Sequence, residues 1–413
     1  MSVQRLDKFL ANSARGTYDG YAFLHNMVIK KSFNNSTLFY SIVSAPVQCL
    51  YSAMRNYLKA DTIRTQHIMT GTTHGGARSM GLEDITDYST SVNPLGMHHT
   101  IYNTLRDVLD QSTEYPDIYN TSLEQDISKY LGIKPEYVTA TNGATDTIYN
   151  ICRHMTQKPV LIQFPIFGEY VTAAKLYNCN TILQQTDNIT RDKDKFIQAI
   201  PQDGCVFVCN PSAPTGRLAC HSTIHDIIKA GKDANCTVVV DECFIELTPD
   251  RDESVLKYVK RYANLVIIRT MTKSFGLAGL RVGYCIANDT ITKGIRQYRI
   301  PWCIGTVAQT AAKEALKHPE HITDAHQIIR TQMPFMYNIL SESPYMEPIR
   351  SDANYMVIRT KQLATTIQNK LLKRKILVRD CTSFGMPYHI RISTKTHDKN
   401  KILCEQLIES CRV

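Results

Sequence analysis

The sequence lacks the cysteine spacings that are typical of zinc sites and disulfide-bonded domains. Its 13 cysteines are an odd number, and no two of them form a Cys-x-x-Cys pair. Several lie inside apolar runs, such as Cys205 and Cys209 in Cys-Val-Phe-Val-Cys. These features argue against a metal site and against a disulfide framework. They favour buried thiols in a reducing compartment, so we expect a cytoplasmic protein without a bound metal.

Long apolar runs and dense basic clusters are also missing. No uninterrupted apolar run reaches the roughly 18 residues that a membrane span needs. The formal net charge is +9, but the 47 lysines and arginines are scattered along the chain. We therefore expect neither a membrane span nor a nucleic-acid partner. A positive cleft that concentrates a small anionic substrate is sufficient to explain the charge.

Residues 1–66 differ in composition from the rest of the chain. They carry eight basic residues against three acidic ones. The shortage of acids would suit a targeting peptide, but Asp7 and Asp19 and the lack of a clean apolar core argue against one. We interpret 1–66 as an N-terminal extension of unknown role.

From about residue 115 onward, short β-branched runs alternate with helical patterns. Thr121–Glu124 has the pattern of a capping box at the start of a helix. The alternation predicts an α/β fold in which helices cover both faces of a mostly parallel sheet. A chain of 413 residues is long for one core. We expect a large domain at 115–305 and a smaller α+β domain formed by 67–114 and 306–413.

Four residues each follow a predicted strand: Gly143, Asn210, Asp241 and Lys273. Ligands of parallel α/β sheets collect beyond the carboxyl ends of the strands. Because all four residues belong at that edge, the sequence predicts a binding site there.

The most informative stretch is Arg269-Thr-Met-Thr-Lys-Ser-Phe-Gly-Leu-Ala-Gly-Leu-Arg281, directly after the apolar run 265–268. Lys273, at the end of a buried strand, is placed to form a Schiff base with an aldehyde cofactor. Thr272 and Arg281 are placed to bind the phosphate of that cofactor. The pattern predicts a site for pyridoxal phosphate (PLP), although an exposed lysine in a glycine-rich turn would look similar.

Other positions supply the remaining groups that PLP needs. A carboxylate at Asp241 would pair with the pyridine nitrogen, and Asn210 would donate to the phenolic oxygen. Phe167 would cover a face of the ring. The alternatives are a turn residue for Asp241 and a core residue for Phe167. Backbone N–H groups at a predicted helix start would bind the phosphate, namely those of Gly143, Ala144 and Thr145.

The order of these motifs resembles the fold-type I PLP enzymes of the aminotransferase class I/II group. The matching segments are 141–145, 165–170, 210–216, 241–244 and 272–283, and the resemblance runs from about residue 72 to the C-terminus. It implies PLP as cofactor and a homodimer. By this resemblance, Tyr115 reaches the cofactor phosphate of the partner subunit.

Within that group the chain is most similar to histidinol-phosphate aminotransferases and to the threonine-phosphate decarboxylases of cobamide biosynthesis. The segments 74–76 with 88–96, 301–302 and 378–385 favour the decarboxylases. So does Phe244, where many aminotransferases have a tyrosine. The resemblance implies that the substrate's anionic groups are bound by His74, Asn93, Arg379 and Arg391.

We therefore expect a decarboxylase that converts O-phospho-L-threonine or O-phospho-L-serine into an amino-alcohol phosphate, with Lys273 and Asp241 as catalytic residues. The alternative is a histidinol-phosphate-like aminotransferase, which differs in the Cα bond that stands perpendicular to the cofactor ring. A PLP-binding transcription regulator is a third class. It would need a DNA-binding module, and 1–66 contains no convincing helix-turn-helix pattern.

Overall fold

The computed structural model describes residues 74–249 and 253–412 of the chain. The described residues belong to one compact unit, Thr70–Val413. The extension expected at 1–66 lies outside the described residues, and the predicted domain boundaries remain a prediction. Within the described ranges, no helix combines the length and the apolar character that crossing a membrane requires.

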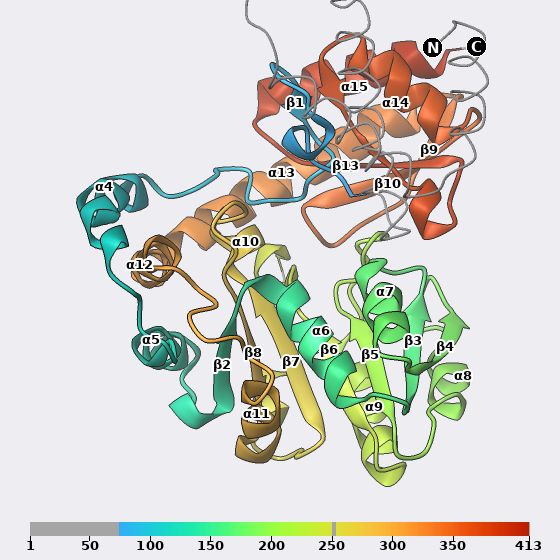
Figure 1. Ribbon diagram of the computed structural model, residues 1–413. Helices are drawn as coiled ribbons and strands as arrows, with labels where there is room; N and C mark the ends of the chain where they lie inside the picture. Colours follow the sequence, from blue (N-terminus) through green and yellow to red (C-terminus); the bar gives the residue numbers. More distant parts are fainter. Residues whose placement is uncertain (1–73, 250–252, 413) are drawn as a thin grey trace, which may run out of the picture. The chain divides into compact units, whose positions relative to one another are not determined.

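A mixed sheet forms the larger part of the described chain (Figure 1). Its seven strands have the order β2-β8-β7-β6-β5-β3-β4. β8 runs antiparallel to both β2 and β7, so β2 and β7 point the same way, and the other neighbours are parallel. The prediction of a mostly parallel sheet is therefore confirmed. The strands are β2 (Val138–Thr141), β3 (Pro159–Phe164), β4 (Asn180–Gln185), β5 (Cys205–Cys209), β6 (Thr237–Asp241), β7 (Leu265–Thr270) and β8 (Gly283–Ala287).

Alternating side chains along these strands form two separate hydrophobic cores. In β5 and β6, Val206 and Val240 face one core, while Phe207 and Val239 face the other. This follows from the two-residue period of a strand. The first core includes α5 (Thr121–Leu131), α9 (His221–Asp233) and α12 (Thr306–Ala315), and the second includes α6 (Gly143–His154), α7 (Glu169–Leu176) and α11 (Asp289–Arg296).

A smaller antiparallel sheet with the order β12-β13-β10-β9 has its own core. In Figure 1, α13 reaches from the vicinity of α12 to this sheet. The strands are β9 (Met346–Pro348), β10 (Tyr355–Thr360), β12 (Arg379–Asp380) and β13 (His389–Ser393). The helices are α13 (Glu320–Ser341), α14 (Ala364–Leu372) and α15 (His397–Cys411). A parallel pair, β1 (Thr86–Asp87) with β11 (Ile376–Leu377), joins the preceding segment to this part.

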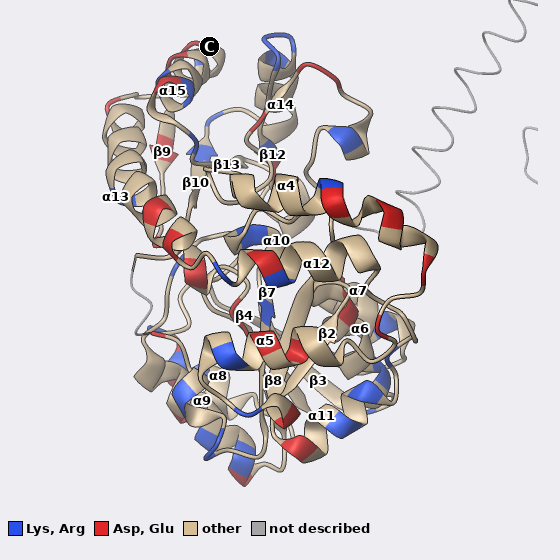
Figure 2. Ribbon diagram, turned by 90° about the vertical axis from the view of Figure 1, so that its left-hand side faces the viewer, with Lys and Arg blue, Asp and Glu red and all other residues tan. Residues whose placement is uncertain are grey.

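The remaining helices are short or lie at the edges of the sheets. They are α4 (His99–Val108), α8 (Lys193–Gln198), α10 (Met271–Ser274), η1 (Arg78–Met80), η2 (Leu109–Thr113), η3 (Pro135–Tyr137), η4 (Ile245–Leu247), η5 (Leu256–Tyr258) and η6 (Thr382–Phe384). Charged residues of both signs occur on outer helices such as α5 and α11 (Figure 2).

The predicted capping box at the start of α5 is wrong. The residue that precedes the helix is Asn120, which makes no side-chain cap. Glu124 is buried, accepts the N–H of Ala140, and forms ion pairs with Arg296 and Arg299. Because this carboxylate is bonded to two arginines and to the N–H of a strand, it does not cap the start of the helix. Tertiary contacts therefore override the local pattern.

Candidate active site

A cavity of about 730 Å³ lies between the ends of the large-sheet strands and the smaller sheet. It is lined by side chains from segments that are far apart in the sequence. Ten of the predicted site residues line it, namely His74, Ala144, Thr145, Phe167, Asp241, Thr272, Lys273, Arg281, Arg379 and Arg391. Of the four residues expected to gather at the strand ends, Asp241 and Lys273 line the cavity, whereas Gly143 and Asn210 do not.

Lys273 lies in α10, the single helical turn that follows β7. The hydroxyl of Thr270 accepts the N–H of Thr272 and so fixes the start of this turn. Burial, and then the positive charge of Arg391, lower the pKa of Lys273 to about 8. Its Nζ atom lies 5.8 Å from the ring centre of Phe244. Near pH 8 the neutral fraction of the Lys273 amine is therefore much larger than that of an ordinary lysine. A nucleophilic amine must be neutral.

Asp241 ends the neighbouring strand β6 and is only 5% exposed. Its Oδ1 accepts the N–H of Cys243 at 2.8 Å, and its Oδ2 accepts a short hydrogen bond from the hydroxyl of Tyr170. Burial raises the pKa of this carboxyl group. Among the described residues Asp241 takes part in no ion pair of 4 Å or less, so a cation in the cavity would stabilise its charged form.

The start of α6 forms the next part of the cavity wall. Asn142 precedes the helix without capping it by its side chain. Gly143 has φ +76°, and a Cβ atom there would lie 2.5 Å from the guanidinium of Arg281. Arg281 itself has φ +59°, an uncommon conformation outside glycine. The glycine thus lets a cation approach the positive end of the helix dipole, which suits a phosphate dianion.

These features fit a PLP cofactor. Lys273 offers an amine of lowered pKa, Asp241 offers a buried carboxylate without a cation, and Arg281 lies beside an uncapped helix start. Thr272 lies next to them, with its hydroxyl 2.8 Å from that of Thr270.

Arg379 and Arg391 form the opposite wall and stand directly across from each other on β12 and β13. Arg379 donates to the hydroxyl of Ser383 at 2.8 Å, and Arg391 donates to the carbonyl of Ser89 at 3.3 Å. The Nε atom of Arg391 is buried without a hydrogen-bond partner. Burial, and then Arg391, lower the pKa of Arg379 to about 10. A buried cation directly across from a half-buried one favours an anionic ligand.

His74 is held beside this wall by a residue that the sequence did not single out. Its Nε2 lies 2.8 Å from Oε1 of Glu169, and the hydroxyl of Tyr149 donates to Oε2 of the same carboxylate. The His74 and Phe167 rings are 5.6 Å apart. Glu169 and Tyr170 both fall within the motif 165–170, so the signal was present but their roles were not assigned.

Four predicted residues are not among those that line the cavity. Both ends of the Asn210 amide bond to the backbone of Ala219, at 2.8 and 3.0 Å. The side-chain amide of Asn93 bonds to the backbone of Ser274 and Leu95. The backbone N–H of Asn93 donates to the carbonyl of Lys273. Gly143 lies behind Arg281, and Tyr115 is 84% exposed beside Trp302. The binding roles expected for all four residues remain predictions.

Residues 86–407 match the family described as aminotransferase class I and II, and the chain belongs to this family. Fold, motifs and cavity agree with this assignment, so the predicted resemblance is confirmed. The protein is a PLP-dependent enzyme of the family.

Two groups of relatives are about equally similar to the chain. A histidinol-phosphate aminotransferase from Caldicellulosiruptor saccharolyticus is 29% identical over 339 residues, 80% of this chain and 93% of the relative. A threonine-phosphate decarboxylase from Salmonella typhimurium is 27% identical over 323 residues, 75% and 88% of the two chains. The solved histidinol-phosphate aminotransferase from Sinorhizobium meliloti, in complex with pyridoxal-5'-phosphate, has a TM-score of 0.74 at 19% identity and covers 81% of this chain and 93% of its own. Similarity alone therefore does not separate the two reactions.

Proposed function

We propose that the protein decarboxylates an O-phospho-L-amino acid, either phosphothreonine or phosphoserine, to an amino-alcohol phosphate. The supporting observation is the pair of arginines on the wall opposite Lys273, the buried Arg379 and the half-buried Arg391. These substrates carry a phosphate and a carboxylate, and planar guanidinium groups bind both through two contacts. His74 lies on the same cavity wall and would add a third donor to the phosphate.

Each residue has a distinct part in this reaction. PLP, when bound, supplies an electron sink next to the Cα atom of the substrate. Asp241 would keep the ring nitrogen protonated, because an ionised carboxylate beside it favours the charged form. Arg379 and Arg391 would bind the anionic groups of the substrate and so orient its Cα–carboxylate bond for cleavage. Lys273 would then return a proton to Cα, for which a pKa near 8 is well matched.

Phe244 supports decarboxylation over transamination. It lies beside Lys273 in the cavity wall and packs edge-on against Tyr355, with ring centres 4.9 Å apart. Many aminotransferases have a tyrosine at this position of the motif. The phenylalanine of this chain resembles the decarboxylase branch instead. The histidinol-phosphate aminotransferase relatives favour the alternative reaction, which would use nearly the same residues.

Product identification tests the proposal. The PLP-loaded enzyme is incubated with phosphothreonine, phosphoserine or histidinol phosphate, with and without 2-oxoglutarate, and carbon dioxide and glutamate are measured. We expect carbon dioxide from a phosphoamino acid without any need for 2-oxoglutarate. Glutamate formed from histidinol phosphate, with no carbon dioxide from either phosphoamino acid, would contradict decarboxylation and establish the aminotransferase. The two phosphoamino acids differ by one methyl group, and such a difference typically allows a discrimination of only ~1–3 kcal/mol between substrates. Their rates should therefore be compared directly.

We also propose a homodimer in which Tyr115 serves the partner's site. The side chains of Tyr115, Tyr119, Ile300 and Trp302 are exposed, and the rings of Tyr115 and Trp302 lie 5.0 Å apart. Such groups of apolar side chains are typical of protein interfaces. Mixing inactive Lys273→Ala and Tyr115→Ala chains should restore activity, because a mixed dimer holds one intact site. A monomer by light scattering, or no recovery from verified mixed dimers, would contradict this arrangement.

A further inference from the structure

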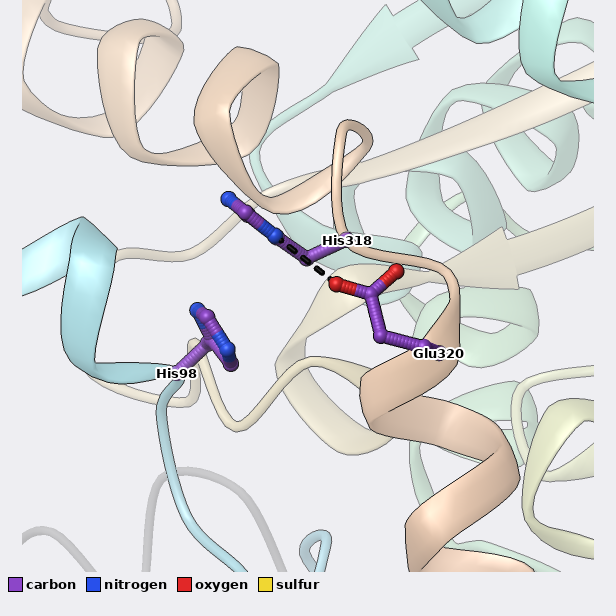
Figure 3. Close-up of side chains that lie close together, drawn as sticks. All are labelled: His98, His318 and Glu320. Carbon is purple, nitrogen blue, oxygen red and sulfur yellow. Dashed lines mark hydrogen bonds and ion pairs between the residues drawn. The ribbon is translucent and has the colours of Figure 1, made fainter.

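A cluster of imidazoles and one carboxylate lies where the start of α4 meets the turn between α12 and α13. Figure 3 shows His98 on one side of this cluster and His318 with Glu320 on the other. One ring nitrogen of each histidine and one carboxylate oxygen of Glu320 lie within 4.8 Å of one another. We propose that these three side chains bind a divalent transition metal ion, zinc in particular. None of the three lines the active-site cavity, so the site is separate from the chemistry at Lys273.

The ligand set decides the class of metal. Two imidazoles and a carboxylate suit zinc and its neighbours in the first transition row, whereas magnesium and calcium prefer oxygen ligands alone. Zinc sites with three protein ligands complete their tetrahedral shell with water. The side chain of Glu320 is 58% exposed, which leaves room for that water beside the ion.

Neighbouring residues already orient both histidines. The Nδ1 atom of His98 lies 2.8 Å from the hydroxyl oxygen of Thr100, and its ring stacks on that of His318 with centres 4.3 Å apart. Nε2 of His318 lies 3.3 Å from Oε1 of Glu314, and its Nδ1 lies 2.9 Å from Glu320, the proposed third ligand. Thr100 and Glu314 are therefore the contacts from outside the ligand set. Outer contacts of this kind fix the ring planes of metal-binding histidines.

The position of the site gives the metal a structural effect. His321 Nε2 lies 2.9 Å from the carbonyl oxygen of Gly96, two residues before His98. That carbonyl packs against Gly276, where a Cβ atom would lie only 2.4 Å away. At its other end the same segment is bonded to the turn of Lys273, through the N–H of Asn93. A metal at His98 would therefore fix a segment, Asn93–His98, that contacts the catalytic turn.

Zinc binding to the full-length holoenzyme tests the inference. Protein treated with chelator and then freed of it is titrated with zinc by calorimetry, and cobalt is used as a coloured probe between 500 and 650 nm. We expect wild type to bind one equivalent of zinc more than His98→Asn or His318→Gln, and to reject magnesium at this site. Asparagine at position 98 retains the capping of α4 while removing the imidazole, so this variant should remain folded.

The control is His154→Ala, which removes an exposed histidine at the end of α6. It should bind as much zinc as wild type. Saturating zinc should raise the thermal midpoint of wild type and of His154→Ala. In His98→Asn, His318→Gln and the isosteric Glu320→Gln, the rise of the midpoint should be smaller than in wild type. Equal zinc uptake, or an equal rise of the midpoint, in wild type and the three cluster variants would overturn the proposal. Neither readout depends on which reaction the enzyme catalyses.

Discussion

The large-sheet side of the cavity presents Lys273 and Asp241 from the ends of neighbouring strands, whereas the opposite side presents Arg379 and Arg391 from a smaller antiparallel sheet. On the first side the Asp241 carboxylate accepts hydrogen bonds from the hydroxyl of Tyr170 and the N–H of Cys243. On the second side Arg391 retains a buried nitrogen without a partner. The fold therefore supplies hydrogen-bond donors to the Asp241 carboxylate, while the arginine side holds positive charge that a bound anion would neutralise.

This difference separates two kinds of variant. Changes on the cofactor side should alter the visible spectrum of bound PLP together with activity. Changes on the arginine side should leave that spectrum in place and weaken the use of substrate. The four predictions below follow this division, from the largest expected effect to the smallest.

Lys273→Ala should abolish turnover and the visible absorbance of bound cofactor while the protein stays folded. The amine is the only lysine nitrogen among the described residues that line the cavity, so no neighbour can replace it. Absorbance spectra, borohydride trapping and circular dichroism provide the measurements. As a control, Lys293→Ala removes an exposed lysine on α11 and should behave as wild type. Retention of a borohydride-trapped adduct in the cavity of Lys273→Ala would show that another amine captures the cofactor.

Arg391→Met should lower kcat/KM for the phosphoamino acid by about 30-fold or more and leave the cofactor spectrum close to that of wild type. Removing one partner of a buried charged contact costs roughly 2–5 kcal/mol, and 1.36 kcal/mol corresponds to about tenfold in rate. Arg359→Met is the matched control, because Arg359 lies on the neighbouring strand β10 but is exposed. Similar losses in both variants would indicate a general effect on the smaller sheet.

Asp241→Asn should retain PLP and lose activity by about 10- to 150-fold. A hydrogen bond to a charged group contributes roughly 1.5–3 kcal/mol, and a neutral amide does not stabilise a protonated ring nitrogen. Steady-state rates and the cofactor spectrum provide the measurements. Tyr170→Phe, which removes only the hydroxyl that donates to Asp241, should have a smaller effect in the same direction. Full activity in Asp241→Asn would rule out the role given to this carboxylate.

The rate at which apoenzyme captures PLP should rise with pH and reach half of its maximum near pH 8, because only the neutral amine attacks the aldehyde. Arg391 lowers the pKa of Lys273 through its positive charge. Arg391→Met should therefore move the midpoint to higher pH, whereas Arg359→Met should leave it in place. Stopped-flow absorbance measures the rate. A midpoint that falls in Arg391→Met would contradict the sign of this interaction.

The sequence predicted the cofactor side well because its groups follow short apolar strands that are recognisable one at a time. Lys273, Asp241 and the start of α6 each needed only a local pattern. β4 was not predicted, because Asn180–Gln185 is a polar edge strand whose side chains are mostly exposed. Glu124 shows the opposite failure, in which a clear local pattern was overridden by two distant arginines.

Contacts between distant segments were out of reach of the sequence. His98 and His318 form one cluster although 220 positions separate them, and no spacing rule for metal ligands covers that separation. The partner of His74, Glu169, comes from a different strand–helix unit. Asn210 was predicted at the correct strand end, but its amide bonds to the backbone of Ala219, and only coordinates reveal this.

Because β8 returns antiparallel beside β7, Lys273 and Arg281 belong to one short connection between adjacent strands. The spacing between the proposed covalent anchor of the cofactor, Lys273, and the cation proposed for its phosphate, Arg281, is therefore set by the length of a single loop. A deletion of one residue in that loop would displace both anchors at once, and no compensating movement of the remaining sheet would restore their separation. If the arginines of the other sheet bind the substrate as proposed, mutations there can change substrate preference without disturbing this spacing.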